Sequence, residues 1–272
     1  MTNNDLELFK ETVWGYYHAH GRDLPWRVPE PNGDFDPYKV MVSEVMLQQT
    51  QVNRVKTKYN EFLVRFPSVA ALARSSFSEV LQVWTGLGYN RRAKFLLGAA
   101  VAVVTEHNGV FPTSAKELES LPGIGKNTAA AIRVYAFNKP DVFIETNIRT
   151  VFIHHFFAGK EAVGDKELLP LIEATVDQEN PREWYWALMD YGTFIKASVG
   201  NVGRVSAHYK KQSKFEGSRR QLRARILRSL LDGPKQLDYF LLTYQDERLD
   251  SVLSDLAGEG LIIRVNKRFT LA

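Results

Sequence analysis

The chain has 272 residues, of which 44% are hydrophobic and 24% charged, and it contains no cysteine. This composition is typical of a soluble globular protein with one large domain or two smaller ones. The lack of cysteine excludes disulfides, Cys-ligated zinc or iron–sulfur centres and a thiol nucleophile within this chain. Apolar runs are too short for a membrane span and the polar N-terminus is unlike a secretory signal, so we expect no membrane partner. The lack of cysteine fits a reducing cytoplasm, which is the expected location. The net charge of +4 only hints at a polyanionic partner.

Helical periodicity dominates the chain up to about Phe194. Strand-like alternation is nearly absent before the C-terminal tail, and short breaks with Pro or Gly separate the helical segments. We therefore predict a mainly α body of roughly ten helices. The predicted helical segments are Leu6–Tyr17, Val40–Val52, Tyr59–Phe66, Phe77–Trp84, Ala93–Val104, Ala115–Ser120, Thr128–Ala136, Ile148–Phe157, Glu167–Asp177 and Trp184–Phe194.

A basic segment follows, between Gly200 and Arg225. It is either a solvated linker or a strip that contacts phosphates, and the sequence leaves both open. Its basic residues, against the single acid Glu216, are Arg204, Lys210, Lys211, Lys214, Arg219, Arg220, Arg223 and Arg225.

The tail predicts a small domain of a different kind. An amphipathic helix begins near Ser218, a short second helix and a third helix ending at glycine follow, and a β-hairpin turns at Asn266–Lys267. Three helices and a hairpin form the winged-helix outline, which binds DNA or mediates protein contacts. The predicted divisions are residues 1–199 for the helical body, 200–217 for a basic linker and 218–272 for the winged-helix-like domain.

The segment "LPGIGKNTAAAI" carries the first sharp chemical signal. Gly123 and Gly125 permit a tight turn that exposes backbone N–H groups at a helix start, where a phosphate can bind. Lys126 adds a positive charge beside that turn. This is the helix–hairpin–helix pattern of sequence-independent binding to the DNA backbone. The alternative is a tight turn between helices that binds no ligand.

A second signal is the single carboxyl of the segment "SEVMLQQTQV". On a helix, three of the four neighbours of Glu44 at three- and four-residue spacing are apolar. Loss of hydration there would raise the pKa of Glu44, as a general acid requires. The alternative is a buried structural glutamate. Gln48 and Gln49 follow, and long amides suit base edges or a gap in the base stack.

Two further segments contain candidates. In "WTGLGYNRRAKFL" a tight turn precedes Arg91 and Arg92, which we expect to approach a phosphate, while Tyr89 could stack on or wedge between bases; a core turn with solvated arginines is the alternative. Asp190, in "WYWALMDYG", is most simply a helix-end cap or a buried hydrogen-bond acceptor, with a supporting role at the site as the alternative.

In this order, the motifs resemble the helix–hairpin–helix DNA glycosylase superfamily, and more narrowly the MutY-type adenine DNA glycosylases. The resemblance covers about the first 195 residues, from "LPWR" through "SEVMLQQTQV", "VWTGLGYNRRA", "LPGIGKNTAAAI" and "ETNIR" to "ALMDYGTFI". It implies a mainly α, two-lobed fold with duplex DNA across a cleft and the target base flipped out.

The resemblance assigns roles residue by residue. Glu44 matches the glutamate that protonates the leaving adenine. The resemblance implies that the base pocket or DNA gap is lined by Gln48, Gln49, Tyr89, Asn127 and Asn147. It also implies that the DNA backbone is contacted by Gly123, Gly125, Lys126, Arg91 and Arg92. The hairpin carbonyls hold a monovalent cation in relatives, and we expect no other metal or cofactor.

Four departures from the family pattern stand out. The catalytic aspartate position is occupied by Glu145, which begins a helix and is also a candidate cap. The lysine that bifunctional relatives use is Asn127, so we expect no β-lyase step. The four cysteines that hold an iron–sulfur cluster are absent, with Lys196 near the first position. The tail lacks the domain that recognises 8-oxoguanine.

The sequence thus predicts a monomeric, monofunctional DNA N-glycosylase, associated with the nucleoid, that excises a mispaired or modified base from duplex DNA in base excision repair. Adenine is the default base. Glu44 would protonate the departing base, and Glu145 would stabilise the sugar cation or position water. The alternative is a catalytically impaired protein that binds lesions or mismatches, and a third is a winged-helix transcription factor.

Overall fold

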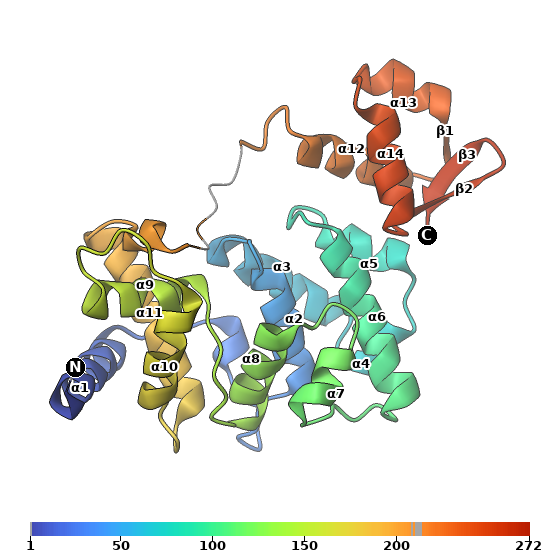
Figure 1. The fold of residues 1–272 in the computed structure, drawn as a ribbon. Helices are drawn as coiled ribbons and strands as arrows, with labels where there is room; N and C mark the ends of the chain where they lie inside the picture. The colour runs from blue at the N-terminus through green and yellow to red at the C-terminus, as the bar shows by residue number, and fades with distance from the viewer. Residues whose placement is uncertain (1, 208, 210–213) are drawn as a thin grey trace. The chain divides into compact units, whose positions relative to one another are not determined.

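The computed structural model describes residues 2–207, 209 and 214–272, which form a mainly helical protein (Figure 1). The basic residues Lys210 and Lys211 lie outside the described residues. The chain divides into two compact units, each built from non-consecutive segments. Unit 1 comprises Met1–Met41, Thr113–Ser120 and Ile124–Lys211, and unit 2 comprises Val42–Pro112, Leu121–Gly123 and Gln212–Ala272.

Unit 1 is organised around its last long helix, α11, which packs against α1, α8 and α9. The buried aromatic residues Trp184 and Tyr185 make α11 a core element, and Gly192 lets α9 approach closely. A Cβ on Gly192 would lie 2.5 Å from the Asn147 carbonyl oxygen. The elements of this unit are α1 (Asn3–His20), η1 (Pro25–Arg27), α7 (Ala115–Ser120), α8 (Lys126–Phe137), α9 (Thr146–Phe156), α10 (Asp165–Thr175), α11 (Pro181–Ser198) and η2 (Val202–Val205).

The helical part of unit 2 has α6 at its centre, packed against α4 and α5. Small buried residues such as Ala99 and Ala100 permit this close packing, while Phe62 and Trp84 fill the space between α3 and α5. Its helices are α3 (Val52–Arg65), α4 (Val69–Ala73), α5 (Phe77–Trp84) and α6 (Arg91–Glu106), preceded by α2 (Pro37–Leu47), which begins in unit 1.

The C-terminal part of unit 2 confirms the predicted winged-helix outline. It consists of α12 (Arg219–Leu231), β1 (Lys235–Gln236), α13 (Leu237–Tyr244), α14 (Leu249–Gly258), β2 (Ile262–Val265) and β3 (Arg268–Leu271). The three strands are antiparallel in the order β1-β3-β2, with Ile262 opposite Leu271 and Lys235 opposite Phe269. The hairpin turns where expected, and Asn266 takes a φ of 56° there. The two-residue strand β1 was not predicted, because it is too short for a strand pattern.

The long helix predicted at Val40–Val52 is instead interrupted. Helix α2 ends at Leu47, and Gln49 adopts the left-handed region with a φ of 54°. Helix α3 then begins at Val52. The apolar spacing continues across the break, so periodicity alone could not reveal it. The divisions predicted at 199/200 and 217/218 stay predictions; α11 ends at Ser198 and α12 begins at Arg219.

Among the described helices, none combines the length and apolar character that crossing a membrane requires.

Candidate active site

Glu145 lies at the N-cap position of α9, in an extended backbone conformation. It makes no side-chain cap hydrogen bond, so the candidate capping role is wrong for its carboxyl. Burial raises the pKa of Glu145, while the charge of Arg149 one turn later and the Thr146 backbone N–H oppose that rise. Arg149 is itself held by a two-pronged ion pair with Asp165, with distances of 2.8 and 2.7 Å. The site therefore offers a half-buried carboxyl beside a fixed cation.

The segment that leads into Glu145 is fixed by side chains from α8 and α11. The Tyr185 hydroxyl donates to the Asp141 carbonyl at 2.9 Å and accepts from the Phe143 N–H at 3.3 Å, and its ring stacks on Phe143 at 4.1 Å. The Asn127 side-chain amide donates to the Ile144 carbonyl at 3.1 Å. Asn127, expected in the base pocket, thus also anchors the residue before Glu145.

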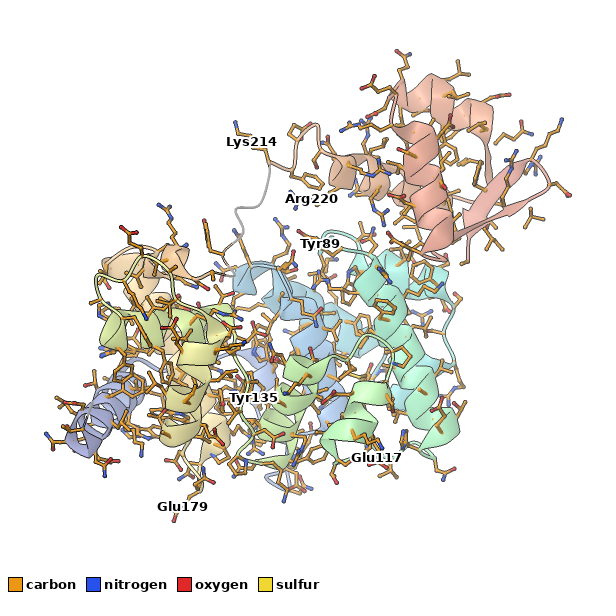
Figure 2. All side chains as sticks on the ribbon, viewed as in Figure 1. Tyr89, Glu117, Tyr135, Glu179, Lys214 and Arg220 are labelled. Carbon is orange, nitrogen blue, oxygen red and sulfur yellow. The ribbon has the colours of Figure 1, made fainter. Side chains whose placement is uncertain are left out.

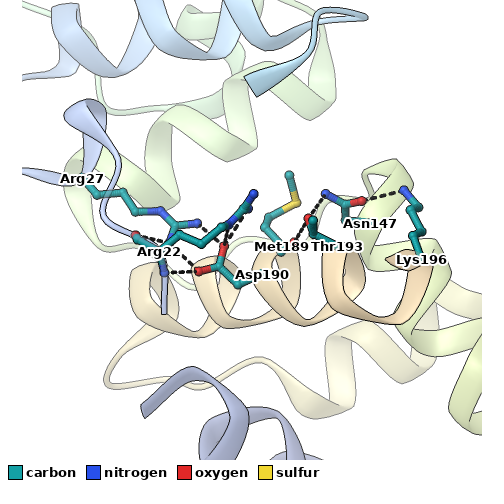
Figure 3. A network of polar contacts seen from close by, with 7 residues as sticks. All are labelled: Arg22, Arg27, Asn147, Met189, Asp190, Thr193 and Lys196. Carbon is teal, nitrogen blue, oxygen red and sulfur yellow. Dashed lines mark hydrogen bonds and ion pairs between the residues drawn. The ribbon is translucent and has the colours of Figure 1, made fainter. Parts of the chain in front are cut away.

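Asn147, the second residue of α9, is held by α11 (Figure 3). Its side-chain oxygen accepts from the Lys196 ammonium at 2.6 Å, and its amide donates to the Thr193 hydroxyl at 3.5 Å. Burial lowers the pKa of Lys196. The expected role of Asn147 in the base pocket stays a prediction, but its side chain is already used to tie α9 to α11.

Asp190 anchors the N-terminal loop from the same helix (Figure 3). Only 1% of its side chain is exposed, and it accepts from both arms of Arg27 and from the backbone and side chain of Arg22, at 2.7–2.8 Å. Burial would raise the pKa of Asp190, but the hydrogen bonds and charges of the two arginines keep it below its ordinary value. Asp190 is the buried acceptor expected, placed inside α11 rather than at a helix end.

The hairpin residues of unit 1 lie at the start of α8. Gly125 is the N-cap residue of α8, and Lys126 and Asn127 begin the helix with exposed side chains. A Cβ on Gly125 would meet nothing within 4 Å, so the space beside this helix start is open. Helix α8 packs on α7, and Ala129 and Ala131 are buried, as the small-residue pattern predicts. Open N–H groups next to a lysine suit an anion.

Gly123, which belongs to unit 2, has a different reason to be glycine. Its φ of 77° is in the left-handed region, and a Cβ there would lie 2.5 Å from the Cβ of Phe95 on α6. Both the backbone conformation and the contact with α6 exclude any other residue without displacement.

Glu44 and the two glutamines surround the end of α2. Glu44 is half-buried on α2 next to the buried Ser43 and Val45, whereas Gln48 and Gln49 follow the helix in the turn. Gln49 is exposed, in its left-handed conformation. Protonation of Glu44 stays a prediction.

Arg92 is buried, and this corrects its expected contact with a DNA phosphate. Only 9% of the residue is exposed. Its guanidinium donates to three carbonyls at the end of α2, those of Val45 (2.7 Å), Met46 (3.0 Å) and Gln48 (2.6 Å). It also donates to the Gly88 carbonyl (3.1 Å) in the turn before α6. Burial lowers the pKa of Arg92 to about 10. Arg92 therefore holds the α2 end and the Gly86–Tyr89 turn together, and only Arg91 remains exposed.

The Gly86–Tyr89 turn carries Tyr89 at the surface in an uncommon conformation. Gly86, Gly88 and Tyr89 have φ values of 100°, 73° and 47°. A left-handed conformation costs a residue with a Cβ roughly 1–2 kcal/mol, and such strain collects at functional sites. Two candidate residues, Gln49 and Tyr89, share this feature, and Arg92 contacts the turns that contain both.

A hollow of about 1040 Å³ within unit 2 brings several candidates together. It is lined by Gln48, Gln49, Tyr89, Arg91, Arg92 and Gly123, together with residues of α12. Glu145, Asn127 and Asn147 belong to unit 1, and Glu44 to unit 2. Sequence reasoning missed the anchoring roles of Lys196, Arg149 and Arg22. Arg149 ends the quoted motif "ETNIR" and Lys196 directly follows "ALMDYGTFI", but no local pattern indicates their partners.

The residues described contain no group of three or more His, Asp or Glu side chains that could hold a metal ion.

A tight turn between α7 and α8, with an open glycine at the start of the second helix, is the helix–hairpin–helix arrangement expected from the sequence. Comparison with known families agrees. Residues 42–170 match the family described as HhH-GPD superfamily base excision DNA repair protein. The chain belongs to this family, and relatives similar to it along nearly their whole length support the assignment.

Two curated relatives and one solved structure illustrate the similarity. The adenine DNA glycosylase of Mycolicibacterium smegmatis is 30% identical over 297 residues, which cover 100% of this chain and 97% of that protein. The adenine DNA glycosylase of Buchnera aphidicola subsp. Baizongia pistaciae is 36% identical over 193 residues, or 69% of this chain and 53% of that protein. Against the Buchnera relatives, the chain thus spans about half of their length. A thermostable thymine-DNA glycosylase superposes with a TM-score of 0.64 at 30% identity, covering 72% of this chain and 89% of that one.

Proposed function

We propose that the protein is a monofunctional DNA N-glycosylase that excises a flipped base from duplex DNA, with mispaired adenine as the default substrate. The observation that carries the proposal is Glu145. Its carboxyl begins α9 without capping it, lies half-buried and faces the charge of Arg149, in the position where the family has its catalytic aspartate. Relatives named adenine DNA glycosylases favour adenine.

The chemistry divides between two carboxyl groups. Breaking an N-glycosidic bond places positive charge on the sugar and negative charge on the departing base. In the proposal, Glu44 is protonated and donates its proton to the base, while ionised Glu145 stabilises the sugar cation or positions the attacking water. The cation of Arg149 favours the ionised form of Glu145 against the effect of burial.

The monofunctional assignment follows from Asn127. A β-lyase step needs an amine that forms a Schiff base, and an amide cannot do this. Asn127 also donates to the Ile144 carbonyl, which makes it a support for Glu145 in this proposal. We further propose a monomer in the cytoplasm, associated with the nucleoid, with a monovalent cation at the hairpin and no iron–sulfur cluster, since the chain has no cysteine ligand.

A panel of duplexes tests the activity. Adenine opposite 8-oxoguanine, guanine or cytosine, thymine or uracil opposite guanine, and matched controls would be incubated with protein and heated in alkali to cleave abasic sites. Thymine belongs in the panel because the superposed structure is a thymine-DNA glycosylase. We expect cleavage at one base type, and its loss in Glu145→Gln and Glu44→Gln. Wild-type protein that cleaves no duplex contradicts the enzyme proposal.

The second candidate function is a catalytically impaired protein that binds lesions or mismatches. It is favoured by the glutamate at position 145, whose extra methylene shifts the carboxyl by roughly an ångström, enough to cost about 10²-fold in rate. Such a protein would bind abasic or mismatched duplexes tightly without turnover, and Glu145→Ala would leave that binding unchanged. Measuring binding and cleavage on the same duplexes separates the two functions.

A further inference from the structure

Helix α12, the first helix of the C-terminal domain, presents cations to the hollow of unit 2. In many helix-turn-helix domains the last helix of the motif enters the major groove. Here that helix is α14, whose exposed polar residues are Asp250, Ser251, Ser254 and Asp255, with no lysine or arginine between Leu249 and Gly258. An acidic helix face repels phosphates. Helix α14 is therefore a poor reader of DNA.

One acid of α14 and the glutamate that follows the helix pair with one side of α12. Arg219 pairs with Asp255 at 2.6 Å, and Arg223 pairs with Glu259, just after α14, at 2.5 Å. A second side of α12, with Leu222, is buried in the domain core. These contacts fix the rotation of α12 about its axis, because two of its faces are committed.

The third side of α12 lines the hollow described above. Arg220, Ala224 and Arg228 follow each other at four-residue spacing, so they share one helix face. Arg220 donates to the Tyr89 hydroxyl at 3.1 Å and lies over the Tyr89 ring at 5.8 Å from its centre, and Figure 2 labels the two residues. The ammonium of Lys94 on α6 donates to the Gly260 carbonyl. Both contacts join the C-terminal elements of unit 2 to the segment between α5 and the end of α6 in the same unit.

The hollow keeps several cations even when the arginines that already have partners within the protein are set aside. Arg92 is occupied by carbonyls and Arg223 by Glu259. The exposed guanidinium groups of Arg54, Arg91 and Arg228 remain, and the structure shows no ion pair for these three among the described residues. The volume of about 1040 Å³ lies at the upper end of the range for small-ligand pockets, about 300–1,000 Å³. A row of cations beside an aromatic ring and two amides suits a nucleic-acid strand.

We propose that this hollow binds a segment of DNA strand, with Arg54, Arg91 and Arg228 on its phosphates and with α12, not α14, as the DNA-contacting helix of the C-terminal domain. The inference rests on the proposed function in so far as the protein acts on DNA. It goes further by assigning a DNA surface to a part of the chain outside residues 42–170, which the family match covers. Arg220 positions the Tyr89 ring at the edge of this strand.

Salt dependence of binding tests the proposal, because each phosphate contact contributes about 0.9 to the slope of log K against log salt concentration. The probe is a labelled duplex with one tetrahydrofuran abasic analogue, which the enzyme cannot hydrolyse. The double variant Arg91→Met/Arg228→Met should lower the slope by about 1.8. Arg228→Lys retains the charge and should retain the wild-type slope.

The matched control is Lys267→Met/Arg268→Met on the β2–β3 hairpin, which removes two exposed cations from the same domain. An unchanged slope for the hollow variant overturns the proposal. If the control then lowers the slope, the hairpin is the DNA surface; if neither does, the hollow suits an acidic protein segment. Circular dichroism melting confirms that the variants are folded. Failure of the proposed function can be told apart from failure of this proposal. In the first case wild-type protein excises no base, yet Arg91→Met/Arg228→Met still lowers the salt slope of DNA binding.

Discussion

Replacement of Arg92 by methionine is expected to destabilise unit 2 strongly, whereas the same replacement at the neighbouring Arg91 is expected to have little effect. Five acceptors lie within 3.1 Å of the Arg92 guanidinium: the carbonyls of Val45, Met46, Gln48 and Gly88, and the Thr50 hydroxyl. Methionine preserves much of the volume but leaves these acceptors without their donor.

The magnitude follows from opposing contributions. The two terminal nitrogens of the guanidinium carry four N–H groups, which the five acceptors share. At the lower end of the range for bonds to a charged group, about 1.5 kcal/mol each, four bonds contribute about 6 kcal/mol. Burial opposes this, because a pKa lowered to about 10 corresponds to a desolvation cost of about 3 kcal/mol. The net loss for Arg92→Met is therefore about 3 kcal/mol, a large fraction of the roughly 5–15 kcal/mol that stabilises a domain.

Urea denaturation followed by tryptophan fluorescence measures this loss, because Trp84 lies in the same cluster and donates to the Gly88 carbonyl. Arg91→Met is the matched control. Its guanidinium is exposed and lies 4.8 Å from the Phe95 ring centre, so we expect a loss below about 1 kcal/mol. If Arg92→Met costs less than about 1 kcal/mol, or no more than the control, the reasoning about the buried guanidinium is wrong.

Two further predictions concern the hairpin and the acid. Gly123→Ala should cost about 2–3 kcal/mol in a melting experiment, because it combines a left-handed φ with a clash against Phe95, whereas Gly125→Ala should change stability by less than about 1 kcal/mol; equal effects would contradict this explanation. For Glu145, the single-turnover excision rate should fall as the pH is lowered, because the ionised form is active. The midpoint of that fall should lie above the ordinary pKa of a glutamate, because burial raises the pKa of Glu145. Arg149→Met removes the opposing cation and should move that midpoint to still higher pH, and a shift to lower pH would refute the assignment.

Local patterns were sufficient for the helices and for the motif residues. Apolar spacing predicted α5 at its observed bounds, Phe77–Trp84, and the C-terminal hairpin turn at Asn266. The glycine of the hairpin at position 123 was predicted from turn geometry, which is a property of a few consecutive residues. The end of α2 was not predicted, because the left-handed Gln49 interrupts an apolar pattern that continues beyond it.

Partners distant in sequence decided the remaining roles. Arg91 and Arg92 are indistinguishable as a basic pair, and only the packing of α6 against the end of α2 buries one and exposes the other. Asp190 could be recognised as an acid among aromatics, yet its partner Arg27 is 163 residues away. Arg220 was one cation in a basic segment until the fold placed it on Tyr89.

The sequence by itself therefore determined the helical class, the motifs and the identity of the two candidate acids, because these depend on residue type and short-range spacing. The tertiary structure alone decided which charged groups are buried, paired or exposed, since burial and ion pairing depend on segments that meet only after folding. For Glu145, the sequence placed a carboxyl at the start of a helix. The fold left it uncapped, held the preceding residue with Asn127 and set Arg149 beside it.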